Sequence, residues 1–132
     1  MELKRGRLID HLHLRTRDLD ASHRFYAAIF EVLGIPLIKG EHHFFADELW
    51  VDRGDTPSHV HFAFQAFDPD MVDRWYEAGL AAGGRDNGAP GERPYHPGYY
   101  AAFLLDPDGN NVEAVYHGPS LRSAAAVTIT AV

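Results

Sequence analysis

Short runs of apolar residues, alternating or continuous, mark where this sequence predicts strands. Leu8–Arg15 and His59–Ala66 both have the pattern of a short strand. Each run is followed by a segment in which apolar residues recur at helical spacing. Asp18 and Asp68 precede these segments, at the position where a helix N-cap is expected. The pattern therefore predicts two strand–helix units.

The two units are copies of one another. When the sequence is shifted by 50 positions without a gap, residues 11–34 match residues 61–84 with seven identities in 24 positions. Ordinary residue frequencies would give roughly one or two identities. The identical pairs are His11/His61, Asp18/Asp68, Asp20/Asp70, Arg24/Arg74, Tyr26/Tyr76, Ala28/Ala78 and Gly34/Gly84. Because a repeat of this kind is a structural unit, we expect the same local fold in both copies.

Short strands are expected after each helix. The first copy offers Leu37–Ile38, His43–Ala46 and Leu49–Asp52, and the second offers Tyr99–Leu105 and Val112–His117 around a turn at Asp106–Asn110. Between the second helix and these last strands, Asp86–Gly98 contains three Pro and three Gly. That composition predicts a long loop with at most one short strand.

The predicted fold class is α+β, with two tandem βαβββ modules that form a curved mixed sheet cup around a pocket. We place the modules at about residues 8–54 and 58–117, within a single domain of residues 1–132. The tail, residues 118–132, ends in apolar and β-branched residues. An additional strand, an arm on a partner and a loose tail are all compatible with it.

Composition excludes several classes of function. The formal charge of −7 argues against a nucleic-acid partner and against docking on anionic membranes. The sequence has no cysteine, which excludes disulfides, thiolate catalysis and zinc fingers. It has no apolar run long enough to span a bilayer. We therefore expect a soluble, cytoplasmic protein without a membrane partner.

The repeat also singles out a candidate metal site. His11 and His61 occupy equivalent positions, so they can converge if the two sheets curve around a common axis. Glu113 follows the turn on an otherwise apolar strand, where a carboxylate is costly to bury unless it is paired or bound to metal. Two imidazoles and one carboxylate suit a single divalent ion (Fe, Mn, Zn, Ni or Co), with positions left for water and substrate. A lone strand histidine is more often structural, so the prediction depends on the repeat.

Three segments resemble the glyoxalase, bleomycin-resistance and extradiol-dioxygenase superfamily, also called vicinal oxygen chelate proteins. They are Ile9–Leu12 with Asp18, Ser22 and Phe25–Tyr26; His61–Phe64; and Phe103–Glu113, which is the most specific. The resemblance covers about residues 8–117. It implies that His11, His61 and Glu113 bind the metal, and that the last two long strands line the pocket.

The resemblance also implies which residues meet the substrate. Tyr99 and Phe103 would line the cavity by strand alternation from Glu113. His13 would lie beside His11, and either His13 as a base or a metal-bound hydroxide would move the proton. The Pro- and Gly-rich loop would form the rim, with Tyr95 and His96 positioned to contact a ligand.

One departure from the superfamily concerns a fourth metal ligand. Relatives of the glyoxalase I type take it from the end of the first module's last strand. There we expect Trp50 to point inward, and Glu48 or Asp52 would need a shifted register. This puts a glutathione-dependent reaction in doubt.

The leading hypothesis is a metal-dependent enzyme of the lyase, isomerase or dioxygenase type, acting on a small substrate with vicinal oxygens. The alternative is a non-catalytic protein that sequesters a small molecule or antibiotic, as in the bleomycin-resistance type. Phe44, Phe45, Trp50 and the apolar tail predict exposed hydrophobic surface and hence a homodimer. The site could form within one chain or between modules of two chains.

Overall fold

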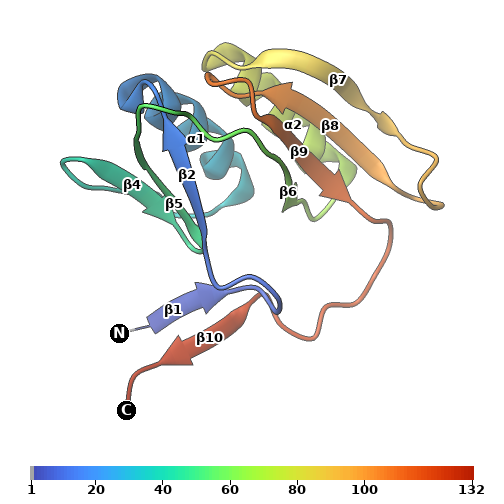
Figure 1. The fold of residues 1–132 in the computed structure, drawn as a ribbon. Helices are drawn as coiled ribbons and strands as arrows, with labels where there is room; N and C mark the ends of the chain where they lie inside the picture. Colours follow the sequence, from blue (N-terminus) through green and yellow to red (C-terminus); the bar gives the residue numbers. More distant parts are fainter. Residues whose placement is uncertain (1) are drawn as a thin grey trace.

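The structure, a computed structural model, describes residues 2–132 (Figure 1). Within this range the helices are α1 (Leu19–Leu33) and α2 (Pro69–Ala81). The strands are β1 (Glu2–Arg5), β2 (Leu12–Thr16), β3 (Ile38–Lys39), β4 (His43–Ala46), β5 (Leu49–Arg53), β6 (His61–Gln65), β7 (Arg85–Glu92), β8 (Tyr100–Leu105), β9 (Asn111–Tyr116) and β10 (Val127–Thr130). No helix among these residues is long and apolar enough to cross a membrane.

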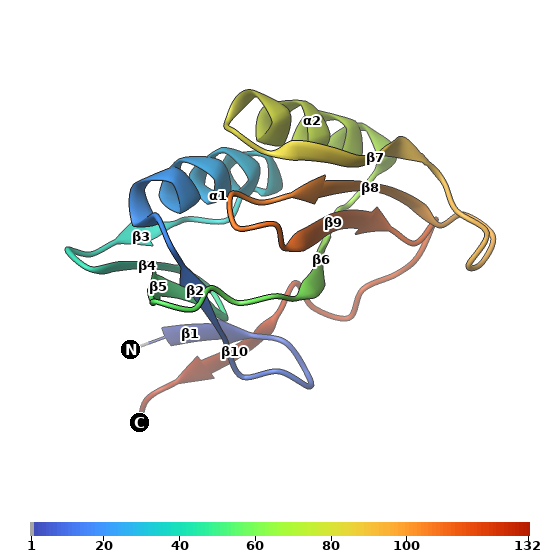
Figure 2. The ribbon, with the colours of Figure 1, turned by 45° about the horizontal axis from the view of Figure 1, so that its top comes forward.

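Each strand–helix unit builds one mixed sheet of four strands. The first sheet has the order β2-β5-β4-β3 and the second β6-β9-β8-β7. β2 runs parallel to β5 and β6 parallel to β9, whereas the other neighbours are antiparallel. Both sheets curve, and each has one helix packed on it (Figure 2). The predicted α+β class with two βαβββ units is confirmed.

Both helices begin at the predicted aspartates. Asp18 Oδ1 accepts a hydrogen bond from the Ala21 N–H at 3.0 Å. In the second copy, Asp68 Oδ1 accepts one from the Met71 N–H at 2.7 Å. Each bond satisfies an N–H group of the first turn that has no partner within the helix. α1 ends at Gly34, where φ is 71°, a conformation that strains residues with a Cβ.

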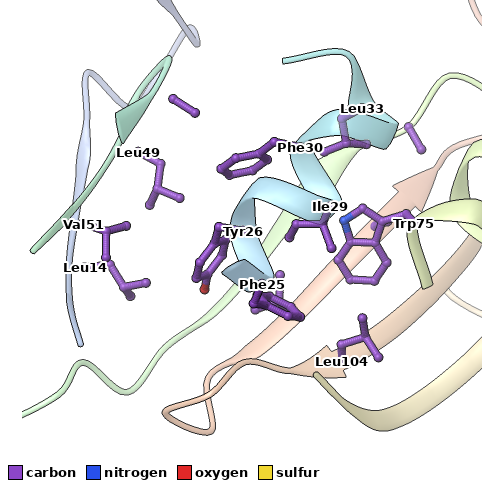
Figure 3. Packing of buried hydrophobic residues seen from close by; sticks show 14 of the residues in the cluster. Leu14, Phe25, Tyr26, Ile29, Phe30, Leu33, Leu49, Val51, Trp75 and Leu104 are labelled. Carbon is purple, nitrogen blue, oxygen red and sulfur yellow. The ribbon is translucent and has the colours of Figure 1, made fainter. Parts of the chain in front are cut away.

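α1 lies between the first sheet and the second module (Figure 3). On one side, Tyr26 faces Leu14 and Val51 of the first sheet, and on the other Ile29 faces Trp75 of α2. All five side chains are fully buried and belong to one hydrophobic cluster that draws on both modules. Burying a large apolar side chain stabilises a fold by roughly 1.5–3 kcal/mol, so this shared cluster holds the modules together.

The helices cover one face of each sheet and leave the other face open. In β2 the buried Leu14 alternates with the exposed His13. In β6 the half-buried Phe64 lies between exposed residues, which share a face of the sheet with His61. Successive side chains of a strand point to opposite faces. The predicted histidine ligands therefore belong to the two open faces, which point away from the helices.

A buried carboxylate joins the β8–β9 hairpin to α1. Asp106 is fully buried and accepts hydrogen bonds from the Tyr26 hydroxyl at 2.7 Å and from the N–H groups of Asp108 and Asn110 at 2.9 and 2.8 Å. Burial, and then the Asp106 charge, raise the pKa of Tyr26, so its phenol stays neutral and donates. Thr16 of β2 adds a hydrogen bond to Asp108 at 2.5 Å. Since an unpaired buried charge is costly, these donors fix the hairpin of the second module on the first.

The segment 86–98, predicted as a long loop with at most one short strand, contains a longer strand than expected in its first half. Arg85–Glu92 forms β7, the edge strand of the second sheet, paired with β8. An edge strand has one row of N–H groups outside the ladder, so it tolerates Pro90. Register shifts on both sides of Gly88, whose φ is 146°, interrupt the pairing. Here Pro and Gly mark an irregular edge strand.

Two smaller expectations are also corrected. The strand predicted to begin at Leu8 begins only at Leu12, the first residue of β2. Leu8 and Ile9 lie before it and are 90% and 51% exposed. Phe44, expected on the exposed apolar surface, is fully buried because it faces α1, where its ring lies 6.1 Å from that of Tyr26. Its neighbour Phe45 lies on the opposite face of β4 and is half-buried.

The end of the tail forms a strand, one of the three possibilities compatible with the sequence. β10 pairs antiparallel with β1, with Glu2 opposite Thr130 and Arg5 opposite Val127. The two strands form a sheet of their own, outside both four-stranded sheets (Figure 1). The segment between β9 and β10 therefore carries the chain from the second module back to its first strand.

Removing the Tyr26 hydroxyl tests the buried contact with Asp106. Tyr26→Phe leaves a buried carboxylate with one donor fewer, so the free energy of unfolding in a urea titration should fall by about 1–3 kcal/mol. Tyr76 is the repeat-equivalent control, since its hydroxyl donates to Asp86 at 2.9 Å on the exposed surface. Water replaces that partner, so Tyr76→Phe should cost much less. Equal losses in both variants would contradict a special role for the buried contact.

Candidate metal and substrate site

The open face of the second sheet brings two of the three predicted metal ligands together. His61 Nε2 lies 2.9 Å from Glu113 Oε1, across the neighbouring strands β6 and β9. The Glu113 side chain is only 4% exposed. Its other oxygen, Oε2, accepts a hydrogen bond from the Tyr99 hydroxyl. A neutral imidazole nitrogen and a carboxylate oxygen are both metal donors, and here they face each other.

Tyr99, predicted to line the cavity, directs its hydroxyl at the candidate metal carboxylate. Burial, and then the hydrogen bond to Glu113, raise the pKa of Tyr99, so the phenol stays neutral and continues to donate. The backbone around it is tied down, because the Tyr99 N–H donates to the His96 carbonyl at 3.2 Å and the Arg93 N–H donates to the Tyr99 carbonyl at 2.8 Å. The phenol is therefore held in place beside Glu113.

Phe103 lies on the same open face. It is directly opposite Glu113 in the β8–β9 ladder, and its ring centroid is 6.0 Å from that of His61. The guanidinium carbon of Arg93 lies 5.4 Å from the centre of the Phe103 ring. Phe103 thus supplies an apolar wall next to the histidine–glutamate pair.

Tyr95 and His96 lie on the loop between β7 and β8, beyond Tyr99. Tyr95 is 67% exposed, and its ring meets that of Tyr99 edge to face at 4.9 Å. His96 Nε2 lies 2.8 Å from His117 Nδ1, and these two rings are stacked. The rim predicted from the sequence therefore rests against the end of β9.

On the open face of the first sheet, His11 has a carboxylate partner. His11 Nδ1 lies 2.7 Å from Asp10 Oδ1. This hydrogen bond, together with the nearby Arg5 guanidinium, lowers the pKa of Asp10. With Nδ1 donating to Asp10, the Nε2 lone pair of His11 is available to a metal. A carboxylate on the second ring nitrogen is the common support for a metal-binding histidine.

His13, the predicted base, also contacts a carboxylate. His13 Nε2 lies 2.8 Å from Asp52 Oδ1, and Arg15 Nε lies 3.1 Å from the same oxygen. Burial acts to raise the pKa of Asp52, but the hydrogen bond from His13 and the charges of His13 and Arg15 outweigh it, and the pKa is lowered. An ionised carboxylate that orients an imidazole is a typical arrangement for a general base. Asp52 reaches this face without the shifted register that we expected it to need.

The chain does not bring His11 to the other two candidate ligands. His11 precedes β2 on the first sheet, whereas His61 and Glu113 belong to the second, and strand alternation puts them on the faces that the helices do not cover. Among residues 2–132, no three or more His, Cys, Asp and Glu side chains are grouped so that they could hold a metal ion. One chain therefore presents two separate parts of the predicted set.

The repeat defines the position of Trp50. His13 pairs with Trp50 between β2 and β5, and Ala63 pairs with Glu113 between β6 and β9. Because residues 13 and 63 are equivalent under the 50-residue shift, Trp50 occupies the place in the first module that Glu113 occupies in the second. The first module presents an aromatic ring at this place, as expected for Trp50.

A cavity of about 460 Å³ lies on the open face of the first sheet. Its lining includes His11, His13, Phe45 and Trp50, and Arg5 of β1 contributes to its wall. Cavities of this size accommodate small organic ligands. The candidate metal ligand of the first module therefore faces a space that a substrate can enter.

Sequence reasoning missed the two carboxylates that support the histidines. Asp10 is the immediate neighbour of His11, and Asp52 is two residues from Trp50 and so shares its face. Both signals were present in the sequence. The contact between His96 and His117 had no such signal, because it depends on the conformation of a loop.

Comparison with known proteins agrees with the fold and with these motifs. A sequence model of the Glyoxalase/Bleomycin resistance protein/Dioxygenase superfamily matches residues 8–114. The chain belongs to this superfamily. The resemblance drawn from the three sequence segments is thus confirmed. β1 and β10 lie outside the residues that the superfamily model matches. A search of curated proteins finds no match.

Solved structures of the superfamily share the fold. A glyoxalase/bleomycin resistance protein from Albidiferax ferrireducens T118 is 28% identical, with a TM-score of 0.73 over 82% of this chain and 97% of that one. A glyoxalase-related enzyme from Fulvimarina pelagi is 20% identical, with a TM-score of 0.72 over 96% and 99%. A lactoylglutathione lyase from Agrobacterium tumefaciens is 24% identical, with a TM-score of 0.61 over 83% and 93%.

The contact between Tyr99 and Glu113 predicts a role in metal affinity. Tyr99→Phe frees Oε2 of Glu113 and removes the group that orients the carboxylate. Changes of this kind weaken metal binding by about 10–100-fold, which titration with Co(II) against a competing chelator would measure. Tyr95→Phe is the control, since Tyr95 is on the same loop and largely exposed. Equal Co(II) affinity in the Tyr99 variant and the unaltered protein would contradict this role.

Proposed function

We propose that this superfamily member is a metal-dependent enzyme of the lyase, isomerase or dioxygenase type that acts on a small substrate with vicinal oxygens. The observation that carries the proposal is the contact between His61 and Glu113 Oε1, with the Tyr99 hydroxyl donating a hydrogen bond to the other oxygen of the carboxylate. A nearly buried carboxylate that faces an imidazole on an open sheet face is arranged as a ligand pair. The lyase among its structural neighbours has the same fold.

The residues present fit one divalent ion, chosen among Fe, Mn, Zn, Ni and Co. His11, His61 and Glu113 would hold it through two neutral imidazoles and one carboxylate, and Asp10 leaves Nε2 of His11 available. When bound, such an ion supplies Lewis-acid stabilisation for the negative charge that develops on substrate oxygens. The three-ligand set leaves coordination positions for those oxygens.

A second copy of the chain would complete the set. The two parts of the candidate site lie on open faces of different sheets, so the first sheet of one copy and the second sheet of another would have to meet. Closed twofold symmetry would then make two equivalent sites per homodimer. The Trp50 side chain, 37% exposed on the first of these faces, is an apolar surface that such a contact would cover.

The remaining polar groups have roles that follow from their contacts. His13, oriented by Asp52, would take the proton from the substrate atom next to the chelated oxygens. Phe103 beside His61 would exclude water from this side of the pocket. Tyr95 and His96 would contact the outer part of the ligand from the rim loop.

Metal content and subunit mixing test the shared site together. Protein purified without a histidine tag should hold about one divalent ion per chain by elemental analysis, and His11→Ala and Glu113→Gln should each lose it. If sites are shared, exchanging subunits between these two variants restores one intact site in each mixed dimer. Random exchange should therefore return roughly one ion per four chains.

His59→Ala is the matched control, because His59 is an exposed histidine just before β6. It should retain its metal. Metal that stays bound in both ligand variants would refute the assignment of the ligands. Metal lost in each variant but not restored by mixing would place the site within one chain.

The aromatic lining of the cavity specifically favours a second candidate, a non-catalytic protein that sequesters a small molecule. Co(II)-loaded protein separates the two. For an enzyme of the proposed type, adding a catechol, a hydroxamate or a 2-oxo acid should shift the visible bands, because their oxygens enter the coordination sphere. A spectrum indifferent to all three, together with tight uptake of bulky compounds by the metal-free protein, would favour the sequestering function.

A further inference from the structure

The strands at the two ends of the chain form a ribbon that lies outside the superfamily match. Within residues 2–132, β1 and β10 pair only with each other, and we call them the terminal ribbon. Lys4 Nζ adds a hydrogen bond to Thr128 Oγ1 at 2.9 Å across the pair. A two-stranded sheet on its own is marginally stable in water. Contacts with the rest of the chain must therefore hold the ribbon in place.

Arg5 reaches from the terminal ribbon into the body of the protein. Its side chain is only 16% exposed. Nη1 donates to the carbonyl of Asp47, in the turn between β4 and β5, at 3.1 Å, and to the carbonyl of Lys4 at 2.9 Å. The next carbonyl of the same turn, that of Glu48, accepts a hydrogen bond from the Leu12 N–H at 2.7 Å. One turn therefore holds both Arg5 and the start of β2.

Asp10 lies between Arg5 and the candidate metal ligand His11. Its Oδ1 is 2.7 Å from His11 Nδ1, and its Oδ2 is 3.7 Å from Arg5 Nε. The Asp10 side chain is 70% exposed, so on its own it would sample several rotamers. The imidazole at one oxygen and the guanidinium charge near the other favour a single rotamer. The orientation of Asp10 therefore depends on a residue of the terminal ribbon.

The Nε–H group of Arg5 strengthens this dependence. Nε is buried and has no hydrogen-bond partner among residues 2–132. A buried donor without a partner costs free energy, and an ionised acceptor satisfies it well. A small rotation of the Asp10 carboxylate toward Nε would supply that acceptor. Asp10 would then be held from both sides, by Arg5 and by His11.

From these contacts we propose that Arg5 is a positioning residue, which orients the Asp10 carboxylate and through it keeps Nε2 of His11 directed at the metal. The inference rests on the proposed function and adds to it a residue outside the superfamily match. The hydrogen bond made by one imidazole nitrogen determines which nitrogen is protonated. With Asp10 in place, the proton of His11 stays on Nδ1 and Nε2 keeps its lone pair. Without Arg5, Asp10 is free to turn into solvent and His11 loses this bias.

Nitrogen-15 NMR of the metal-free protein reads the tautomers directly at about pH 8, where imidazoles are neutral. His11 should carry its proton on Nδ1. His61 should carry it on Nε2, because this nitrogen faces a carboxylate oxygen at 2.9 Å. Arg5→Gln keeps a donor for the turn but removes the charge next to Asp10. In this variant His11 should shift toward the Nε2–H tautomer, whereas His61 should stay unchanged.

Co(II) affinity, measured by competition with a chelator, tests the consequence for the metal. Arg5→Gln should weaken binding by about 10-fold, the lower end of the range for groups that support a metal-binding histidine. In an Asp10→Ala background the same change should weaken it by less than about twofold, because Arg5 acts through Asp10. Lys4→Gln is the matched control, since Lys4 is the other cation of β1 and its ammonium group contacts Thr128 and Glu2 within the ribbon. It should keep both the affinity and the tautomer.

The outcomes separate this inference from the proposed function. An Arg5→Gln variant with unaltered tautomers and Co(II) affinity would overturn the inference and leave the proposed function standing. An equal loss of affinity in Lys4→Gln, or an equal effect of Arg5→Gln with and without Asp10, would also overturn it. If the unaltered protein binds no Co(II), the proposed function fails and the positioning of a metal ligand fails with it. A loss that occurs in Arg5→Gln, requires Asp10 and is absent from Lys4→Gln supports the inference.

Discussion

In the β8–β9 hairpin a fully buried carboxylate, that of Asp106, accepts hydrogen bonds from backbone N–H groups of its own turn and from the Tyr26 hydroxyl of α1. A charge without these donors could not be buried at this place at acceptable cost. The contact therefore couples the turn of one module to the helix of the other. Together with the packing of Ile29 on Trp75, it holds α1 between the first sheet and the second module (Figure 3).

This arrangement separates the assembly of each half of the site from the meeting of the halves. In the second module, His61, Glu113 and Tyr99 are ordered by contacts within one sheet and its loop. In the first module, His11 and His13 are ordered by their own carboxylates. Each half is thus organised before it faces anything else. A second copy would have to bring the two halves close together, but it would not have to rearrange either of them.

Local signals made much of this fold predictable from sequence. The gapless repeat identified equivalent strands and helices, and aspartate caps and Gly34 marked helix ends where the structure has them. The pairing of the tail with β1 was not predictable, because 122 or more residues separate its partners and no local pattern reports such a contact. The length of β7 was underestimated because Pro90 and its neighbouring glycines are typical of loops. An apolar pattern shows which helix face is buried but not which module covers it.

The same limit applies to the candidate site. Equivalence under the repeat selected His11 and His61, and the cost of burying a charge selected Glu113. Neither criterion predicts how far apart the two modules place these residues. The partners of the histidines could have been found, since Asp52 shares its face with Trp50 by simple alternation. The partner of Tyr99 could not, because its hydroxyl reaches Glu113 from the end of a loop whose path the sequence leaves open.

The equivalence of Trp50 and Glu113 has a consequence for how the two halves can diverge. The same backbone position holds a ring in one half and a carboxylate in the other, and the two residues share no contact within the chain that would tie one to the other. Within one chain, mutations that reshape the surface around Trp50 therefore leave the contacts of Glu113 with His61 and Tyr99 in place. In a duplicated scaffold of this kind, one half can acquire contacts to new ligands while the other half keeps its original residues and their chemistry.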